Sequence, residues 1–110
     1  MQQKFYSKQL ILLGGGHSNI QVLKKLCMNE YIGLQTILIS ENYDATYSGL
    51  TPAYLQNQIK KTEISIDLQR LCFNAGVTFI KDRVVSLDPN NQSLDLQTHP
   101  SIDYDLLSIN

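Results

Sequence analysis

The sequence predicts an α/β fold, in which an antiparallel hairpin is inserted into a mostly parallel sheet. Residues 10–13 and 37–39 are continuous apolar runs, which are typical of parallel strands covered on both faces. An amphipathic segment connects these runs, and a turn-rich spacer at residues 88–92 separates two later strand-like segments. The chain has 110 residues, of which 43% are hydrophobic and 17% charged, so it suits one small domain and not a disordered or collagen-like sequence.

The first half of the chain predicts one βαβ unit. A strand is expected at residues 8–13, where the apolar run ends in three glycines. From Ile20, apolar side chains recur at offsets of three, six and seven, which predicts a helix of about ten residues that begins near Ser18 and Asn19. Residues 29–33 end this helix, and a second strand is expected at residues 36–40. Such a crossover between parallel strands is nearly always right-handed.

The second half predicts one helix and several strands. Residues 41–58 have no clear period and contain Gly49 and Pro52, so we expect a long loop with a helical turn at residues 53–56. A second helix is expected between Asp67 and Gly76, because apolar side chains recur there every three or four positions. A third strand at residues 77–80, a hairpin formed by residues 83–87 and 93–97, and a last strand at residues 104–109 complete the prediction.

Charge and cysteine content argue against several kinds of function. Nine basic and ten acidic residues are spread along the chain, so we expect no nucleic-acid partner. No apolar run is long enough for a membrane span, and we expect a cytoplasmic location. Cys27 and Cys72 are far apart in the sequence and form neither a redox motif nor a metal-binding pattern. We expect each to be an inert thiol on the apolar side of its helix, and we predict no metal site.

The three glycines that follow the first strand predict a phosphate-binding turn. Gly14, Gly15 and Gly16 match the start of the dinucleotide-binding fingerprint, and Asn19 stands where that fingerprint prefers Gly or Ala. Glycine makes the tight turn and lets the backbone approach a pyrophosphate, and the start of the next helix supplies N–H groups. Because the last fingerprint position serves helix-to-strand packing, we expect Asn19 to loosen that contact.

An acidic residue at the end of the second strand completes the pattern. Glu41 lies 22 positions after Asn19, and an acidic side chain at about this spacing accepts hydrogen bonds from the adenosine ribose. The alternative is that Glu41 is a solvated loop carboxylate. His17 either contacts a phosphate or is an exposed residue without a role. The pattern predicts an adenine dinucleotide site and does not distinguish FAD from NAD.

Five segments together resemble the N-terminal FAD-binding region of the pyridine nucleotide-disulfide oxidoreductase superfamily. They are GGGHSNIQVLKKL, ISEN, TYSGLTPAYLQ, IDLQRLCFNAGVTFIKDRVVSLDP and YDLLSIN. Within the superfamily they are most similar to the NADH-dehydrogenase-like branch, especially the oxidoreductase module found alone or fused to selenide, water dikinase. The resemblance implies that residues 1–110 are a partial Rossmann-like FAD-binding domain, the N-terminal fragment of a longer flavoprotein.

The resemblance also implies which residues bind FAD. Those expected at the pyrophosphate are Gly14, Gly15, Gly16, His17 and Ser18. Those expected at the adenosine are Glu41, Asn42 and the main chain of Val84, whose alternative role is core packing. Tyr47 and Ser48 are expected near the isoalloxazine ring, with an ordinary surface loop as the alternative.

The function implied by the resemblance is electron transfer through FAD. NAD(P)H would be the co-substrate, and a quinone or another small molecule would accept the electrons. No residue is predicted to be a catalytic acid or base, and His99 is far in sequence from the glycine turn. We expect the fragment alone to be inactive and to retain FAD weakly or not at all. The alternatives are the oxidoreductase module of a selenide, water dikinase fusion and a non-catalytic nucleotide-binding domain.

Overall fold

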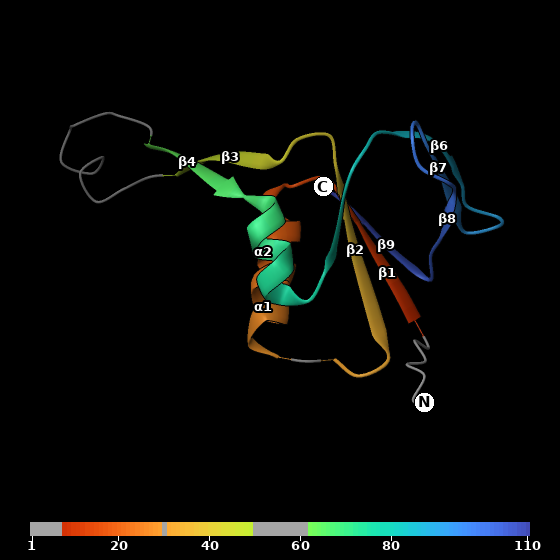
Figure 1. The fold of residues 1–110 in the computed structure, drawn as a ribbon, viewed down its shortest axis with the longest axis horizontal. Helices are drawn as coiled ribbons and strands as arrows, with labels where there is room; N and C mark the ends of the chain where they lie inside the picture. Colours follow the sequence, from red (N-terminus) through yellow and green to blue (C-terminus); the bar gives the residue numbers. More distant parts are fainter. Residues whose placement is uncertain (1–7, 30, 50–61) are drawn as a thin grey trace.

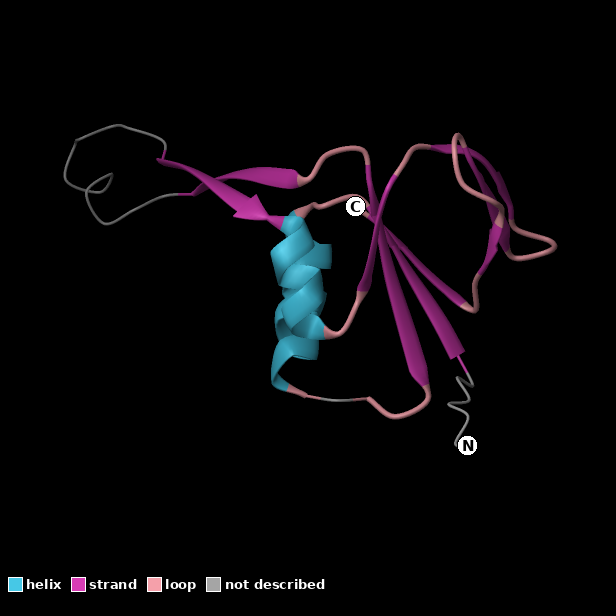
Figure 2. Cartoon of the chain, in the orientation of Figure 1, coloured by secondary structure: helices cyan, strands magenta, loops and turns pink. Residues whose placement is uncertain are grey.

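A computed structural model describes residues 8–29, 31–49 and 62–110, with the backbone alone for residues 46–49 and 62–64. The elements, in chain order, are β1 (Lys8–Leu13), α1 (His17–Met28), β2 (Leu34–Ser40), β3 (Asp44–Gly49), β4 (Thr62–Asp67), α2 (Leu68–Ala75), β5 (Thr78–Lys81), β6 (Val84–Asp88), β7 (Ser93–Leu96), β8 (Ile102–Asp103) and β9 (Leu106–Ile109). Figure 2 shows helices and strands together in the described chain, which confirms the predicted α/β class.

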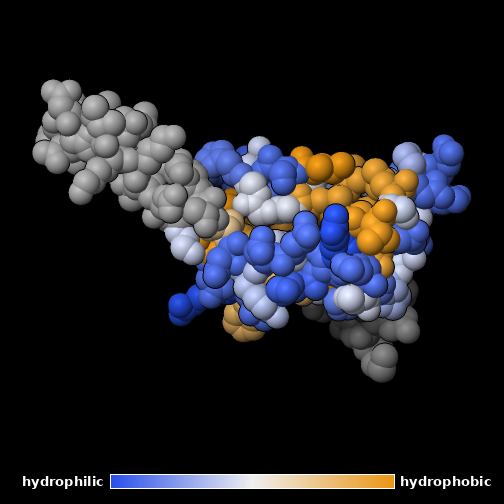
Figure 3. All heavy atoms as spheres, turned by 90° about the horizontal axis from the view of Figure 1, so that it is seen from above, coloured by the Kyte–Doolittle hydropathy of each residue, from blue (hydrophilic) through white to orange (hydrophobic). Residues whose placement is uncertain are grey.

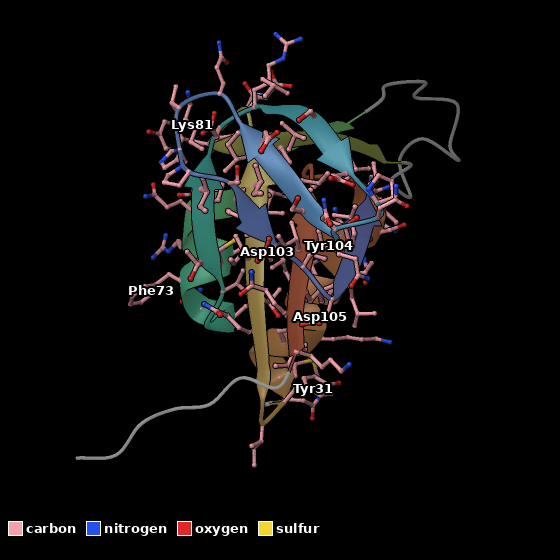
Figure 4. All side chains as sticks on the ribbon, turned by 90° about the vertical axis from the view of Figure 1, so that its right-hand side faces the viewer. Tyr31, Phe73, Lys81, Asp103, Tyr104 and Asp105 are labelled. Carbon is pink, nitrogen blue, oxygen red and sulfur yellow. The ribbon has the colours of Figure 1, made fainter. Side chains whose placement is uncertain are left out.

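A four-stranded parallel sheet is the centre of the fold. Its strand order is β5-β2-β1-β9, so β1 pairs with β2 on one side and with β9 on the other. The helices α1 and α2 lie together beside this sheet (Figure 1). The Asp105 carboxylate accepts a hydrogen bond from Gln9 N at 2.7 Å, where the chain enters β9. Asp103, Tyr104 and Asp105 follow one another along this entry (Figure 4).

Alternating side chains divide the core into two halves, one on each face of the parallel sheet. Leu12 and Leu38 are buried in the half that includes both helices. Ile11 and Ile37 are buried in the other half, against Leu94 of β7. This division follows from the two-residue period of a strand, which sends neighbouring side chains to opposite faces. The fold therefore has three layers: helices, parallel sheet and antiparallel sheet.

The predicted hairpin is present and is part of a three-stranded antiparallel sheet. β6 pairs with β7, and β7 pairs with β8, which the sequence analysis did not anticipate. The Asp88 carboxylate accepts hydrogen bonds from the backbone N–H groups of Asn90 and Asn91 at 3.1 and 3.2 Å. These bonds close the turn between β6 and β7, as short polar side chains commonly do.

The predicted loop at residues 41–58 is wrong at its start. Residues 44–49 form β3, which pairs antiparallel with β4. β3 contains mostly small and polar residues, so it gives little of the alternation that marks a half-buried strand. In β4 the residues Ile64 and Ile66 do alternate with polar residues, which is a signal that the sequence analysis missed. The helical turn predicted at residues 53–56 lies outside the described residues.

The two cysteines differ in environment. Cys72 of α2 is buried, as predicted, but Cys27 of α1 is exposed, which corrects the expectation for that residue. The apolar stripe of α1 shifts away from Cys27 near the end of the helix, where Met28 is also exposed. Burial, with a smaller contribution from Cys27, raises the pKa of the Cys72 thiol to about 12.

The described surface carries both polar and apolar areas. From above, hydrophobic atoms gather in one area beside a hydrophilic one (Figure 3). Exposed apolar side chains include Phe73, which points away from the molecule in Figure 4, and Ile109 at the end of β9. None of the described helices is both long enough and apolar enough to cross a membrane.

Candidate cofactor site

A small cleft lies where three parallel strands end. The glycine turn follows β1, Glu41 follows β2, and Asp82 follows β5. Parallel strands have their carboxyl ends at one edge of the sheet, where ligands bind in open α/β folds. The cleft has a volume of about 190 Å³ and is lined by Leu13, Gly14, Ile39, Ser40, Glu41, Asp82, Arg83 and Val84. It therefore brings together three predicted site residues: Gly14, Glu41 and Val84.

The glycine turn has a backbone conformation that requires glycine. Gly14 has a φ of 89°, in the left-handed region that other residues rarely adopt. Its N–H donates to the carbonyl of Ile39 at 2.8 Å, which joins the turn to the end of β2. Gly16 is the N-cap residue of α1 and accepts the first hydrogen bond of the helix, from Ile20 N at 3.0 Å. The chain thus turns directly from β1 into α1.

Asn110 contacts this turn closely. Its side-chain Oδ1 accepts hydrogen bonds from the backbone N–H groups of Ser18 at 2.9 Å and Asn19 at 3.3 Å. A Cβ on Gly14 or Gly16 would overlap with atoms of Asn110. The first N–H groups of a helix lack partners within the helix, so an acceptor oxygen from elsewhere stabilises them. The start of α1 is therefore a site for an acceptor oxygen, and Asn110 supplies one.

Gly15 is required by packing with the second helix. A Cβ at this position would lie 2.8 Å from Leu68 Cδ1 and 3.2 Å from the Cβ of Ala45. Real Cβ atoms almost never come within 3.0 Å of a neighbouring atom, so even an alanine at this position would require the buried Leu68 side chain to shift. The absence of a side chain at Gly15 thus lets the glycine turn pack closely against α2 and β3.

Asn19 ties α1 to the sheet. Its buried side-chain amide donates to the carbonyl oxygens of Leu13 at 3.0 Å and Gly14 at 2.9 Å. Its Oδ1 accepts a hydrogen bond from the hydroxyl of Ser108 at 2.8 Å. The expectation that Asn19 loosens the contact between helix and strand is therefore wrong. Hydrogen bonds from this longer side chain replace the close backbone packing that glycine would allow.

The turn after β2 presents Glu41 and Asn42. Both residues are exposed, and Glu41 lines the cleft. The Asn42 N–H donates to the hydroxyl of Ser40 at 3.2 Å, which fixes the turn. A carboxylate accepts hydrogen bonds from hydroxyl groups, so its position at the cleft suits a sugar.

Asp82 is a buried residue of the cleft that no sequence pattern predicted. Its side chain is 2% exposed and contacts the His99 ring at 2.5 Å between Nδ1 and Oδ2. The hydroxyl of Thr98 donates to the same oxygen at 2.9 Å, and Arg83 N donates to the other oxygen at 2.6 Å. Desolvation alone would raise the pKa of Asp82, but the hydrogen bonds from His99, Arg83 and Thr98 outweigh it and hold this pKa well below its usual range.

The other predicted residues occupy different places. His17 is the first residue of α1 and is exposed. The backbone of Tyr47 and Ser48 lies in β3, and their side chains are not described, so flavin contact by these residues stays a prediction. Among the described residues, no three His, Cys, Asp or Glu side chains are grouped as metal ligands would be.

A larger hollow of about 610 Å³ lies at the opposite edge of the sheet. The residues that line it include Gly33 and Leu34 before and at the start of β2, and Gly76 and Thr78 before and at the start of β5. None of the predicted site residues lines it. Its place at the amino ends of the strands separates it from the glycine turn.

Comparison with known proteins shows what this chain is similar to. No protein-family model matches the chain. The sulfide-quinone reductase of Aquifex aeolicus is 31% identical over 106 residues, covering 94% of this chain and 24% of that protein. The crystal structure of the Aquifex aeolicus sulfide:quinone oxidoreductase has a TM-score of 0.68 at 27% identity, over 94% of this chain and 24% of its own. Sulfide-quinone reductases are members of the FAD-dependent pyridine nucleotide-disulfide oxidoreductase superfamily, and almost all of this chain is similar to one part of them.

A further structure supports the fold alone. A ferredoxin reductase from Rhodopseudomonas palustris has a TM-score of 0.64 at 24% identity and covers 94% of this chain and 26% of its own. The present chain thus spans about a quarter of the length of these superfamily members. The resemblance to this superfamily that the sequence predicted is confirmed. Neither of these relatives is a selenide, water dikinase.

Proposed function

We propose that this chain is the FAD-binding segment of a flavin oxidoreductase. The observation that carries the proposal is the cleft at the carboxyl edge of the sheet, where Gly14, Glu41 and Val84 meet. The start of α1 adjoins it, with two N–H groups directed at a single acceptor oxygen. A glycine turn, a helix start and a carboxylate after the next strand are the parts that bind an adenine dinucleotide.

Each part of the site has a separate task. The N–H groups of Ser18 and Asn19 hold the diphosphate, with the positive end of the α1 dipole behind them. For a phosphate oxygen to accept from these groups, the Asn110 carboxamide has to turn away, because its Oδ1 now accepts from both. Glu41 accepts hydrogen bonds from the ribose, and the main chain of Val84 contacts the adenine. FAD, when bound, supplies the two-electron chemistry at its flavin ring.

The electron donor and acceptor are the finer part of the proposal. NAD(P)H as donor rests on the superfamily resemblance, and a quinone or another small molecule is the proposed acceptor. The relative at 31% identity is named for a quinone, which supports an electron-transfer role in general. Tyr47 and Ser48 are proposed to lie toward the isoalloxazine ring. Within this segment we assign residues to binding and orientation and none to proton transfer.

The test is a titration of the ¹⁵N-labelled chain with FAD, followed by amide chemical shifts. We expect saturable shifts at residues 14–18, 41–42 and 84, with weak affinity because the chain spans 24% of its curated relative. Glu41→Gln should weaken binding by roughly 1–3 kcal/mol, since it removes a charged acceptor from the ribose site. Asp103→Asn, which changes an exposed carboxylate on β8, should leave the affinity unchanged. Shifts absent from the glycine turn, or an unchanged affinity of Glu41→Gln, would contradict the proposal.

A further inference from the structure

We propose that Asp82 is a positioning residue for the adenosine end of the cleft, because it holds the backbone of Arg83 and Val84 in place. The inference rests on the proposed FAD site and adds a residue to it. Asp82 lines the cleft, yet its side chain is 2% exposed and is directed at protein groups. Its contribution to a ligand is therefore indirect.

The Asp82 carboxylate joins segments that are far apart in sequence. The Asp82 N–H donates to the carbonyl of Ser40 at 3.0 Å, at the end of β2. The carboxylate accepts from Arg83 N at 2.6 Å and from the N–H and hydroxyl of Thr98 at 3.1 and 2.9 Å. His99 adds a contact at 2.5 Å. Asp82 thus links three segments: its backbone N–H reaches the end of β2, and its carboxylate joins the start of β6 to the loop after β7.

The network constrains the segment that is proposed to contact adenine. The Arg83 N–H is bound to Asp82, and the Arg83 carbonyl accepts from Gln97 N at 2.9 Å. The N–H and the carbonyl of Arg83, which directly precede Val84, are therefore both fixed, one by the Asp82 carboxylate and the other by the backbone that follows β7. Recognition by main-chain atoms depends on the placement of the backbone, which surrounding hydrogen bonds provide. Movement of this segment would change the cleft at Arg83 and Val84 without altering the glycine turn.

The network requires an ionised carboxylate at this position. The backbone N–H groups of Arg83 and Thr98 and the Thr98 hydroxyl donate to this side chain. A carboxylate accepts at both oxygens, whereas an amide brings two donor hydrogens. In Asp82→Asn, one end of the side chain would therefore face donors with a donor of its own. The lowered pKa of Asp82 agrees with an ionised group held by these bonds.

The experiment compares two ligands that share the phosphates and differ in the adenosine. We would titrate ¹⁵N-labelled wild-type and Asp82→Asn chains with ADP and with inorganic pyrophosphate. The expected result is that Asp82→Asn weakens ADP binding by about tenfold and changes pyrophosphate binding by less than about twofold. Asp95→Asn is the matched control, because the Asp95 carboxylate likewise accepts hydroxyl hydrogen bonds, from Ser86 at 2.6 Å and Ser101 at 2.5 Å. It does not line the cleft and should leave both affinities unchanged.

Each outcome decides the matter. If Asp82→Asn lost the same factor of affinity for ADP and for pyrophosphate, Asp82 would have a purely structural role and the inference would be overturned. Binding of ADP by Asp82→Asn with the affinity of the wild type would overturn it as well. If Asp82→Asn does not fold, Thr98→Val removes one donor at the rim of the network and should show the same selective loss at about threefold. Thr98→Val without that selectivity overturns the inference. If the wild-type chain binds neither ligand, the proposed FAD site itself fails.

Discussion

At the scale of single residues, Asn110 has two opposing effects. Its Oδ1 caps the start of α1, and it occupies the place where a phosphate oxygen would accept from Ser18 N. Asn110→Ala should lower the free energy of unfolding by about 1 kcal/mol, the usual value of a helix cap. The same variant should bind inorganic pyrophosphate at least as tightly as the wild type does. Urea unfolding and a pyrophosphate titration measure the two effects.

A second substitution at Asn110 separates capping from competition. Asn110→Asp keeps an acceptor at the start of α1. Its negative charge interacts favourably with the positive end of the helix dipole, which stabilises the chain without a ligand. The same charge repels a diphosphate, so we expect weaker pyrophosphate binding than in Asn110→Ala. If Asn110→Ala lost both stability and pyrophosphate affinity, Asn110 would be a ligand of the phosphate and not its competitor.

Asn19 should contribute to stability through its buried hydrogen bonds. Asn19→Ala leaves the carbonyls of Leu13 and Gly14 and the hydroxyl of Ser108 without this partner. We expect a loss of about 2–3 kcal/mol in the free energy of unfolding, because buried polar groups would be left unpaired. Gln21→Ala, at an exposed position of the same helix, should change stability by less than about 0.5 kcal/mol. A loss below that of Gln21→Ala would show that Asn19 does not hold α1.

Sequence patterns predicted the residues of the site that depend on local geometry. The glycine turn and Glu41 follow two apolar runs at a fixed spacing, and the structure places Gly14 and Glu41 in one cleft. Asp82 and Asn110 could not be found in this way. Thr98 and His99 lie 16 and 17 positions from Asp82, and Ser18 lies 92 positions from Asn110, so these residues meet only through the packing of sheets. Contacts between residues so distant in sequence produce no periodic pattern.

At the scale of elements, α2 has two defined ends. Asp67 accepts a hydrogen bond from Arg70 N at 3.0 Å, and Gly76 ends the helix with a φ of 71°. A Cβ on Gly76 would meet no atom within 4 Å, so a side chain there costs backbone strain alone. Gly76→Ala should therefore lower the free energy of unfolding by about 1–2 kcal/mol. Gly76→Asn should lose less in the same urea measurement, because asparagine tolerates this conformation better. Equal losses in both variants would contradict this explanation.

The elements that the sequence predicted well are those with a strong apolar pattern. The apolar residues of α1 and α2 repeat at the spacing of a helix, β1 and β2 contain continuous apolar runs, and the observed positions of all four follow the prediction closely. β3 was missed because polar residues dominate it, and β8 because it has only two residues. Both are held by pairing with a neighbouring strand, which a single segment's sequence does not reveal.

At the scale of the whole molecule, the two halves of the core have different tasks. The half that contains α1 and α2 places the helix start against the glycine turn. The half beneath the antiparallel sheet brings Thr98 and His99 to Asp82. The cleft lies where the two halves meet the end of the parallel sheet. The antiparallel sheet thus shapes one side of the site, although none of its strands carries a predicted phosphate contact.

Stability of the whole molecule should fall at high pH because of Cys72. Burial raises the pKa of this thiol from 9.0 to about 12, so between these values the folded chain retains a proton that the unfolded chain releases. The unfolded state then binds fewer protons, and the free energy of unfolding decreases as pH rises. Below pH 9 the contribution of the neutral thiol is fully present. Cys72→Ala removes the titrating group, so its free energy of unfolding should fall less steeply between pH 9 and 12.

Measuring unfolding by urea at several alkaline pH values tests this expectation. Tyrosine and lysine residues also titrate in this range. They are the same in the wild type and in Cys72→Ala, so their effects cancel when the free energies of unfolding of the two proteins are subtracted. Cys72→Ala starts from a lower stability, because it leaves a cavity in the core. The test therefore compares how steeply the free energy of unfolding falls with pH, and not its absolute value. Cys27→Ala, at an exposed position, should keep most of the wild-type slope, since burial of Cys72 is the larger cause of its raised pKa. If Cys72→Ala and the wild type lost stability in parallel, the thiol would not be the group that titrates on unfolding.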